Sequence, residues 1–95
     1  MIKSFSDKST EELFNREKVS KLPSTILKAA YRKLLIIDAA DRIEDLRIPP
    51  GNRLEKLTGN LSGKFSIRIN NRWRIIFSWR GSNAFEVEII DYHKG

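Results

Sequence analysis

The spacing of hydrophobic residues changes along the chain, from a helical period in the first half to strict alternation in the last third. Residues 9–12, Ser-Thr-Glu-Glu, have the form of a capping box, in which a Ser oxygen accepts from a free N–H and a Glu three positions later reaches back. They predict a short helix from about Thr10 to Lys18, with Leu13 and Phe14 as its main apolar contacts. Before it, alternation over residues 1–5 predicts a short strand.

A longer helix is predicted to open at Pro23 and Ser24. Its apolar residues recur at helical spacing and form a wide stripe, which we interpret as core. These residues are Leu27, Ala30, Tyr31, Leu34, Leu35 and Ile37. Residues 38–46 then predict the end of this helix or a short extra helix, and the Pro-Pro-Gly-Asn sequence at 49–52 predicts a turn.

Three strands are predicted in the last third of the chain, over residues 64–70, over residues 73–79 and after a turn signal at residues 81–83. One face of these strands is apolar, with Phe65, Ile67 and Ile69, then Trp73, Ile75, Phe77 and Trp79, then Phe85, Val87 and Ile89. Consecutive hairpins make the simplest arrangement. We therefore expect an α+β fold, in which two N-terminal helices pack on one face of a small, mainly antiparallel sheet.

The alternation constrains how the first two strands pair, because a slip of one residue would turn every side chain to the other face. Pairing Ile69 with Trp73 keeps the apolar residues together and places Arg68 opposite Arg74 on the other face. Like charges directly across a ladder destabilise a sheet, so this pair needs a counter-charge. An anion such as a phosphate would neutralise both, since guanidinium groups suit bidentate contact with phosphate.

Pairing Trp79 with Phe85 keeps the apolar face together in the second hairpin and sets Glu88 opposite Ile76. The resulting open face carries Arg68, Arg74, Glu86, Glu88, Ile90 and Tyr92. The alternative to a bound anion is that Glu86 and Glu88 supply the counter-charge and the face is ordinary solvated surface. Alternation alone leaves these two interpretations open.

The composition excludes several classes of protein. The chain has 95 residues, one His and no Cys, which fits one domain spanning residues 1–95 and leaves no disulfide, Cys-based metal site or multi-His metal site. The longest apolar run, residues 34–37, is far too short to span a bilayer. Residues 1–20 lack the apolar segment of a signal peptide. We therefore expect a soluble, cytoplasmic, basic protein of a single domain, with no membrane-spanning segment.

The net charge of +6 is unevenly distributed. Residues 47–95 carry nine Lys and Arg against four Asp and Glu, whereas residues 1–46 carry nine against eight. A basic excess in one half suggests an anionic partner, nucleic acid above all. A solvated surface that keeps the protein soluble is the alternative that charge alone leaves open.

Few residues suggest catalysis by themselves. Asp91, Tyr92 and His93 end the third strand, and a His can move protons near neutral pH while a Tyr can stack on a base. A lone His near a C-terminus is nevertheless more often a surface residue than a catalyst. Glu86 and Glu88 could form an acid and base pair, but nothing else resembles a sugar site. The chain shows no Gly-rich phosphate loop and no readable Ser/His/Asp arrangement.

Longer motifs add a family resemblance. Residues 54–68, Leu-Glu-Lys-Leu-Thr-Gly-Asn-Leu-Ser-Gly-Lys-Phe-Ser-Ile-Arg, resemble the segment that leads into the sheet of HigB-type toxins. Residues 71–77, Asn-Arg-Trp-Arg-Ile-Ile-Phe, resemble the same family, as do the opening residues 1–5 and the closing residues 91–93. The resemblance covers essentially the whole chain and is densest over residues 49–93.

HigB toxins belong to the RelE-like superfamily of small α+β ribonucleases. The resemblance implies an endonuclease that cleaves mRNA on the ribosome, through attack of the RNA 2′-hydroxyl on the adjacent phosphate, with no metal and no cofactor. It also implies a partner, the helix-turn-helix antitoxin HigA, which binds the toxin and represses the operon. Operator DNA would then be bound only through the complex with the antitoxin.

The resemblance assigns roles to individual residues. Arg74 matches the sheet arginine of the family, which is implied to bind the scissile phosphate and stabilise its transition-state charge. Tyr92 and His93 match a C-terminal Tyr-His pair, with His93 moving a proton and Tyr92 orienting the substrate or stacking on a base. Contacts with mRNA and ribosomal RNA phosphates are expected from Arg53, Lys56, Arg68, Arg72 and Lys94.

Two positions depart from some members of the family. Where those have a His followed three residues later by a Lys, this chain has Glu55 and Thr58. Glu55 becomes the candidate base, and Lys56 or Arg53 becomes the candidate for the missing positive charge. The alternative function is therefore a catalytically weakened RNA-binding or regulatory module with the same fold.

Overall fold

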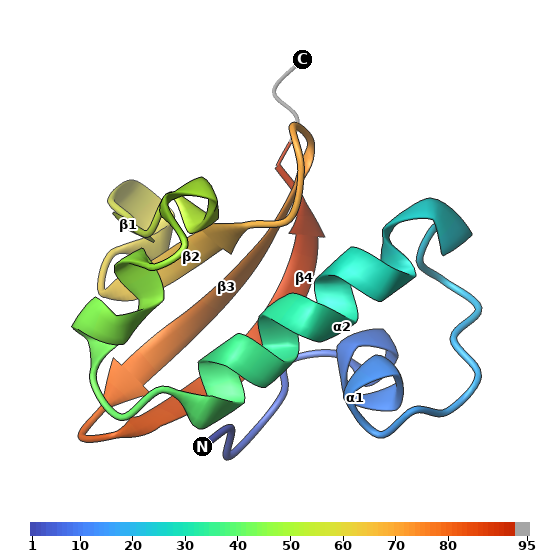
Figure 1. Cartoon of the computed structure of the whole chain (residues 1–95), viewed down its shortest axis with the longest axis horizontal. Coiled ribbons are helices and arrows are strands. Elements are labelled where there is room, and N and C mark those ends of the chain that lie inside the picture. The colour runs from blue at the N-terminus through green and yellow to red at the C-terminus, as the bar shows by residue number, and fades with distance from the viewer. Residues whose placement is uncertain (93–95) are drawn as a thin grey trace.

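The computed structural model describes residues 1–92 and has two helices packed against one sheet, which confirms the expected α+β fold (Figure 1). The helices are α1 (Lys8–Phe14) and α2 (Ser24–Ala39), followed by the short 3-10 helices η1 (Ile43–Arg47), η2 (Pro50–Asn52) and η3 (Gly59–Leu61). The antiparallel sheet keeps chain order, from β1 (Glu55–Lys56) through β2 (Lys64–Arg68) and β3 (Trp73–Arg80) to β4 (Asn83–Asp91). Among residues 1–92, no helix is long and apolar enough to cross a membrane.

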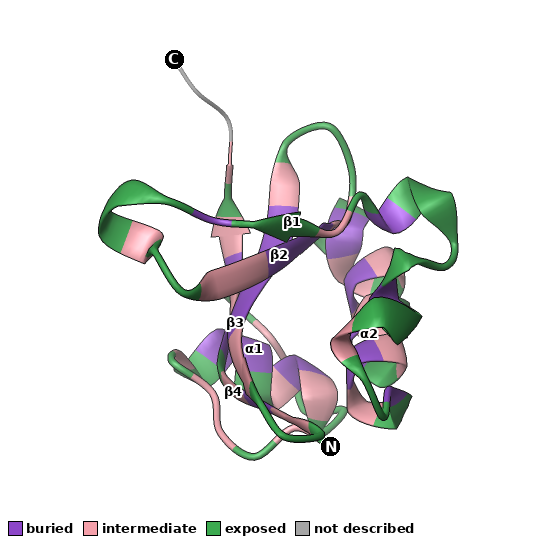
Figure 2. Cartoon of the chain, turned by 90° about the vertical axis from the view of Figure 1, so that its left-hand side faces the viewer, coloured by how far each residue is buried: buried purple, intermediate pink, exposed green. Residues whose placement is uncertain are grey.

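The core lies between α2 and the sheet. Leu34 and Ile37 of α2 are fully buried in one cluster with Ile67, Ile75 and Phe77 of the two central strands. Figure 2 shows this burial along β2 and β3 and on one side of α2, whereas β1 is exposed. Each fully buried Leu, Ile or Phe contributes roughly 1.5–3 kcal/mol by leaving water, so this cluster fixes the position of α2 on the sheet.

The predicted short helix is shorter than its sequence pattern suggested. α1 ends at Phe14, four residues before the predicted end, because Arg16 takes a left-handed conformation with φ 62°. The predicted capping box is wrong, since α1 begins at Lys8. Thr10 lies inside the helix, where its fully buried hydroxyl accepts a hydrogen bond of 3.0 Å from the backbone N–H of Ile89. That side chain therefore ties α1 to β4.

The predicted N-terminal strand is reduced to two isolated bridges. Ile2 and Phe5 bridge in parallel to Ala84 and Val87 at the outer edge of β4. Backbone N–H groups on both sides of the contact donate hydrogen bonds of 2.8–3.0 Å across it. These bonds cover part of an edge that would otherwise leave backbone groups unpaired.

The predicted long helix is confirmed, and its core face is partly corrected. Ala30, Leu34 and Ile37 are buried as expected, and Ile26, which the predicted stripe omitted, is buried beside them. Leu35 is 43% exposed and lies outside the core. The buried positions follow the spacing of one narrow face of a helix, which the wide apolar stripe in the sequence did not resolve.

The register of the first hairpin is the predicted one, with Arg68 opposite Arg74. In the second hairpin Glu88 faces Ile76, also as predicted. The predicted pairing of Trp79 with Phe85 is wrong. A β-bulge in β4 shifts the register by one residue between the Ile76–Glu88 pair and the turn of the hairpin.

The bulge lies at Glu86, which has a positive φ of 55°. Trp79 consequently pairs with Ala84, and Ala84 takes the fully buried core position expected for Phe85. Phe85 lies half-buried beneath the guanidinium of Arg80, which is 4.0 Å from its ring centroid.

Strand β1 was not predicted. It pairs only two residues with β2, Glu55 with Ser66 and Lys56 with Phe65, and both of its residues are exposed. Two residues carry no readable alternation, so no hydrophobic period marks them in the sequence. The strand nevertheless brings residues 53–58 beside the central strands.

Two neighbouring leucines of α2 test this account of the core. Leu34→Ala should lower the free energy of unfolding by roughly 2–5 kcal/mol, because it empties a fully buried site. Leu35→Ala, the matched control one residue away, should change it by no more than about 0.5 kcal/mol. Urea denaturation followed by circular dichroism measures both, and equal losses would contradict the assigned face of α2.

Candidate functional site

Arg74 lies near the beginning of β3, on the face of the sheet opposite the helices, and only 8% of it is exposed. Its Nε donates a hydrogen bond of 2.9 Å to the hydroxyl of Ser66, which is fully buried on β2. Its Nη2 donates a hydrogen bond of 2.6 Å to the backbone carbonyl of Arg53. The sheet therefore holds a guanidinium group in a fixed position at the site predicted for a phosphate-binding arginine.

The segment before β1 supplies the second contact because of its backbone conformation. Arg53 ends η2 with a left-handed φ of 46°, so the chain turns there and β1 begins two residues later. The turn aims the Arg53 carbonyl at Arg74 and brings the carboxylate of Glu55 to 3.7 Å from its Nη2 atom. Glu55 is thus the carboxylate paired with Arg74.

Tyr92 completes the site from the end of β4. Its backbone N–H donates a hydrogen bond of 2.6 Å to the carbonyl of Arg72, and the guanidinium carbon of Arg74 lies 5.4 Å from its ring centroid. A hollow of about 240 Å³ opens beside this ring and is lined by Glu55, Lys56, Leu57, Thr58, Leu61 and Tyr92. The positions at which the sequence departs from the HigB pattern, Glu55 and Thr58, therefore line the same hollow as Tyr92.

Burial lowers the pKa of Arg74, and the nearby charges of Arg68 and Arg53 lower it further, while Glu55 and Tyr92 oppose them. An arginine keeps its proton even so, since its ordinary pKa is far above neutral. The result is a positive charge that water screens poorly. Such a charge interacts with an approaching anion more strongly than an exposed one does.

The other two arginines at this end of the sheet are held by the chain itself. The Nε of Arg68 donates to the carbonyl of Asn70 at 3.1 Å, and its Nη2 donates to the side chain of Asn71. Arg72 contacts the carboxylate of Asp91 through both Nε, at 2.9 Å, and Nη2, at 2.7 Å, and this hydrogen bond raises the pKa of Arg72. Arg68 and Arg74 are thus opposite in register, but their guanidinium groups have different partners.

Glu86 and Glu88 lie in different environments, and the carboxylate beside Arg74 is that of Glu55. Glu86 is exposed at the bulge and pairs with Lys64 at 3.0 Å, which lowers its pKa. Glu88 is partly buried, and burial, with the nearby charge of Asp7, raises its pKa. Their opposite environments leave Glu55 as the acidic partner of the buried arginine.

The remaining predicted residues fall into two groups. Arg53 and Lys56 are exposed beside the site. His93 and Lys94 lie outside the described residues.

Ser66 was not predicted as a site residue, although alternation places this small polar residue on the open face, two positions before Arg68 and diagonal to Arg74. Within residues 1–92, no group of three or more His, Cys, Asp or Glu could hold a metal ion.

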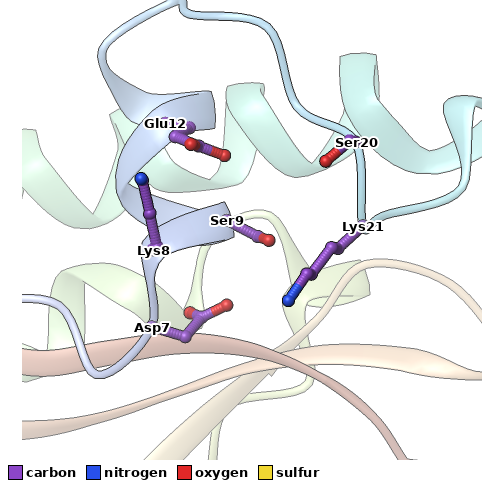
Figure 3. A pocket seen from close by; sticks show the side chains of 6 residues that line it. All are labelled: Asp7, Lys8, Ser9, Glu12, Ser20 and Lys21. Carbon is purple, nitrogen blue, oxygen red and sulfur yellow. The ribbon is translucent and has the colours of Figure 1, made fainter.

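A second hollow, of about 330 Å³, lies beside α1 and is distinct from this site (Figure 3). It is lined by Asp7, Lys8, Ser9, Glu12, Ser20 and Lys21. The side chain of Lys21 extends toward Asp7, so charges of both signs surround the hollow (Figure 3). This mixture gives it no preference for an anion, in contrast to the Arg74 site.

Comparison of the sequence with known families and proteins agrees with the fold. The family model described as RelE-like toxin of type II toxin-antitoxin system HigB matches residues 3–93. The protein named Toxin HigB-1 from Vibrio cholerae is 48% identical over 91 residues, which are 95% of each chain. The protein named Endoribonuclease HigB from Proteus vulgaris is 32% identical over 93 residues, which are 98% of this chain and all of that one.

Solved structures show the same fold. One chain of the YoeB-YefM complex from Staphylococcus aureus aligns with a TM-score of 0.61 at 23% identity, covering 99% of this chain and 97% of that one. YafQ from E. coli aligns with a TM-score of 0.52 at 16% identity, covering 90% of this chain and 86% of that one. At these identities the likeness concerns the fold alone.

The two glutamates of β4 provide a test of the electrostatics of this face. A raised pKa means that the folded chain binds the proton of Glu88 more tightly than the unfolded chain does, so the free energy of unfolding falls as the pH rises from about 4.3 through the raised value. Glu88→Gln should therefore be more stable than the parent chain at pH 7, and this difference should vanish below about pH 4.

Glu86→Gln is the matched variant, for which the expected change in the free energy of unfolding at pH 7 has the opposite sign. Because Lys64 lowers the pKa of Glu86, ionisation of Glu86 stabilises the fold at neutral pH, and this stabilisation is lost as the pH falls through the lowered pKa. Glu86→Gln should be less stable than the parent at pH 7. Urea denaturation at neutral and acidic pH measures both variants, and changes of the same sign would show that the two environments are wrongly assigned.

Proposed function

The chain belongs to the HigB-like family of RelE-like type II toxins, and on that premise we propose that it is an endoribonuclease that cleaves mRNA on the ribosome. One observation carries the proposal: the buried guanidinium of Arg74 lies within reach of Glu55 and the Tyr92 ring, beside a hollow. A poorly solvated, fixed cation is suited to the charge that develops on a phosphate during RNA cleavage.

In the proposed reaction the RNA supplies its own nucleophile. The 2′-hydroxyl attacks the adjacent phosphorus and loses its proton to a base, and the leaving 5′-oxygen takes up a proton as its bond to phosphorus breaks. The products are a 2′,3′-cyclic phosphate and a 5′-hydroxyl. The chain contributes proton transfer and stabilisation of the phosphate charge, so the proposal assigns no role to a metal or a cofactor.

Arg74 is proposed to bind the scissile phosphate, and Glu55 to act as the base. The Glu55 side chain is 53% exposed and can reach the hollow, while its distance of 3.7 Å from Nη2 keeps it beside the proposed phosphate position. Tyr92 is proposed to orient the substrate or stack on a base, since aromatic rings commonly bind splayed RNA bases. His93 is proposed as the second proton-transfer group, by its match to the family motif.

The basic surface is proposed to hold the chain on ribosomal RNA through phosphate contacts. The residues assigned to these contacts are Arg53, Lys56, Arg68, Arg72 and Lys94. The net charge of +6 supports this assignment. Arg68 and Arg72 would contact phosphates from the positions in which Asn71 and Asp91 hold them.

We propose a HigA-type helix-turn-helix antitoxin as the protein partner. The YoeB-YefM complex contains a chain of this fold, which supports a protein partner for this chain as well. The match to a toxin family of toxin-antitoxin systems supports an antitoxin as that partner. Operator DNA would be bound only through the resulting complex. A single domain spanning residues 1–95 and a cytoplasmic location, where mRNA and ribosomes are found, are parts of the same proposal.

The alternative is a catalytically weakened RNA-binding or regulatory module. The observation that favours it is the ion pair of Glu55 with Arg74, because a carboxylate at that position opposes an incoming phosphate. Both functions share the fold and the basic surface, so only activity separates them.

Removing the guanidinium tests the proposed enzyme. Arg74→Ala should lower the rate of mRNA cleavage on programmed ribosomes by roughly 10²–10³-fold and abolish growth arrest, because it removes the group proposed to stabilise the transition state. Arg80→Ala is the control, since Arg80 lies on the same strand but packs on Phe85, away from the hollow. Both variants are compared with the parent chain, with and without the antitoxin.

If the parent chain neither arrests growth nor produces cleaved mRNA in translating extracts, the enzyme is excluded. Retained binding to ribosomal RNA that weakens with salt would then support the alternative module. Equal activity of Arg74→Ala and the parent would exclude Arg74 as the phosphate-binding residue.

The C-terminal segment gives a second test. Deleting residues 92–95 should abolish cleavage and leave the fold intact, because the fully core-facing positions of β4 end at Ile89. Circular dichroism checks the fold, and cleavage on programmed ribosomes checks the activity. Loss of the folded signal would show that this segment is structural and would refute its purely catalytic assignment.

A further inference from the structure

We infer that Ser66 is the positioning residue of the Arg74 guanidinium and that it commits Arg74 to bind the scissile phosphate through its Nη1 end rather than through the side edge that Ser66 occupies. This inference rests on the proposed function and deepens it. It assigns a role to a residue that lies outside the candidate catalytic and RNA-binding sets. It also specifies which edge of the guanidinium meets the substrate.

The geometry of a guanidinium group decides which edge is available. Its five N–H bonds form two forks, a side edge made by Nε and Nη2 and an end made by Nη1 and Nη2. The side edge is used by the chain itself, because Nε donates to the Ser66 hydroxyl at 2.9 Å and Nη2 donates to the Arg53 carbonyl at 2.6 Å. A phosphate therefore cannot form a bidentate contact with that edge while the site is intact.

The end of the guanidinium remains for the ligand. Within residues 1–92, Nη1 of Arg74 makes no hydrogen bond or ion pair, and the carboxylate of Glu55 approaches Nη2 at 3.7 Å, beyond hydrogen-bond distance. Glu55 also lines the hollow that Tyr92 closes. Nη2, which belongs to both forks, is therefore the atom nearest the proposed base, and Nη1 is the nitrogen left for the phosphate.

Burial makes Ser66 decisive. Both partners are nearly inaccessible to water, with Ser66 fully buried and Arg74 8% exposed. Without the hydroxyl, the buried Nε–H would have no acceptor, and a buried donor without a partner is unfavourable. The guanidinium would rotate to find one, and the fork that meets the phosphate would lose its alignment. A displacement of about 1 Å at a reacting group can lower a rate by about 100-fold.

The register of β2 and β3 explains why Ser66 is the residue that accepts the hydrogen bond from Arg74 Nε. On the open face Arg74 lies directly opposite Arg68, and Ser66 lies two positions away on the same strand as Arg68, diagonal to Arg74. Diagonal neighbours on one face are within reach of long side chains. A long side chain at position 66 would occupy the space into which Nε points, whereas Ser, like Thr, provides a hydroxyl acceptor with little volume.

The first experiment reads the anchor without requiring any activity. In ¹⁵N-labelled parent chain, the Nε–H of Arg74, assigned by its absence in Arg74→Lys, should give a resonance protected from exchange with water. Ser66→Ala should remove that protection and Ser66→Thr should retain it. Equal protection in the parent and in Ser66→Ala would overturn the inference.

The second experiment reads the catalytic consequence. Ser66→Ala should lower kcat for cleavage on programmed ribosomes by roughly 10- to 100-fold with KM changed less than about threefold, because alignment rather than contact area is lost. Ser66→Thr should recover most of kcat. Ser78→Ala is the matched control, since Ser78 lies on the same face of the sheet and bonds Glu86 instead. It should leave kcat and KM unchanged.

The outcomes separate this inference from the function on which it rests. A parent chain with a protected Arg74 resonance but no cleavage refutes the proposed function and leaves the anchor in place. A parent chain that cleaves mRNA, with kcat and protection both insensitive to Ser66→Ala, refutes the inference alone. A fall in thermal stability of Ser66→Ala with unchanged kcat would show that Ser66 is purely structural.

Discussion

A guanidinium group can be buried on a sheet only if the chain provides partners for its charge and its N–H bonds, since an unpaired buried charge is strongly destabilising. Arg74 has such partners from three different elements. The Ser66 hydroxyl comes from β2, the Arg53 carbonyl from the turn after η2, and the carboxylate from Glu55 of β1. The conformation of residues 53–56 and the register of β2 are both linked to this one side chain.

The same constraint connects the site to the helical layer. Asn52, directly before Arg53, is fully buried, and its side-chain amide donates to the carbonyls of Leu46 and Ile48 at 3.2 and 3.3 Å. Its side-chain oxygen accepts a hydrogen bond from Lys33 of α2. The turn that aims the Arg53 carbonyl at Arg74 is therefore held against α2, and α2 is held on the sheet by the core. Packing on one face of the sheet thus supports a polar site on the other.

How much of the fold could be predicted from the sequence depends on how many residues each hydrophobic pattern covers. Alternation over β2 and β3 gave the correct pairing of Arg68 with Arg74, because a register error there would have exposed the whole core face. The bulge at Glu86 left no mark in the alternation, so Phe85 was wrongly given the place of Ala84. The two-residue β1 carries no period, and the capping box at Ser9 failed because α1 already begins at Lys8. The bond of Thr10 to Ile89 across the fold was not predicted either. Contacts made over long sequence separation are invisible to local patterns.

In the candidate site, too, some residues could be predicted from local patterns and others depend on long-range contacts. Residues 74 and 92 were identified by resemblance and by alternation together, and they are neighbours in the fold. The pairing of Glu55 with Arg74 depends on the left-handed turn at Arg53, which no residue type announced. Non-glycine residues rarely adopt that conformation, and it is stabilised here by the contacts that surround it. Site chemistry in this chain therefore comes from the tertiary placement of short segments.

The central claim is that this site promotes attack of a 2′-hydroxyl on the phosphate at Arg74. The most direct measurement uses ribosome-bound mRNA with a single 2′-deoxy nucleotide at the mapped cleavage position, compared with the all-ribose mRNA. The ribose message should yield a fragment ending in a 2′,3′-cyclic phosphate, and the 2′-deoxy message should stay intact at that position. Cleavage of both messages at the same position would contradict the claim.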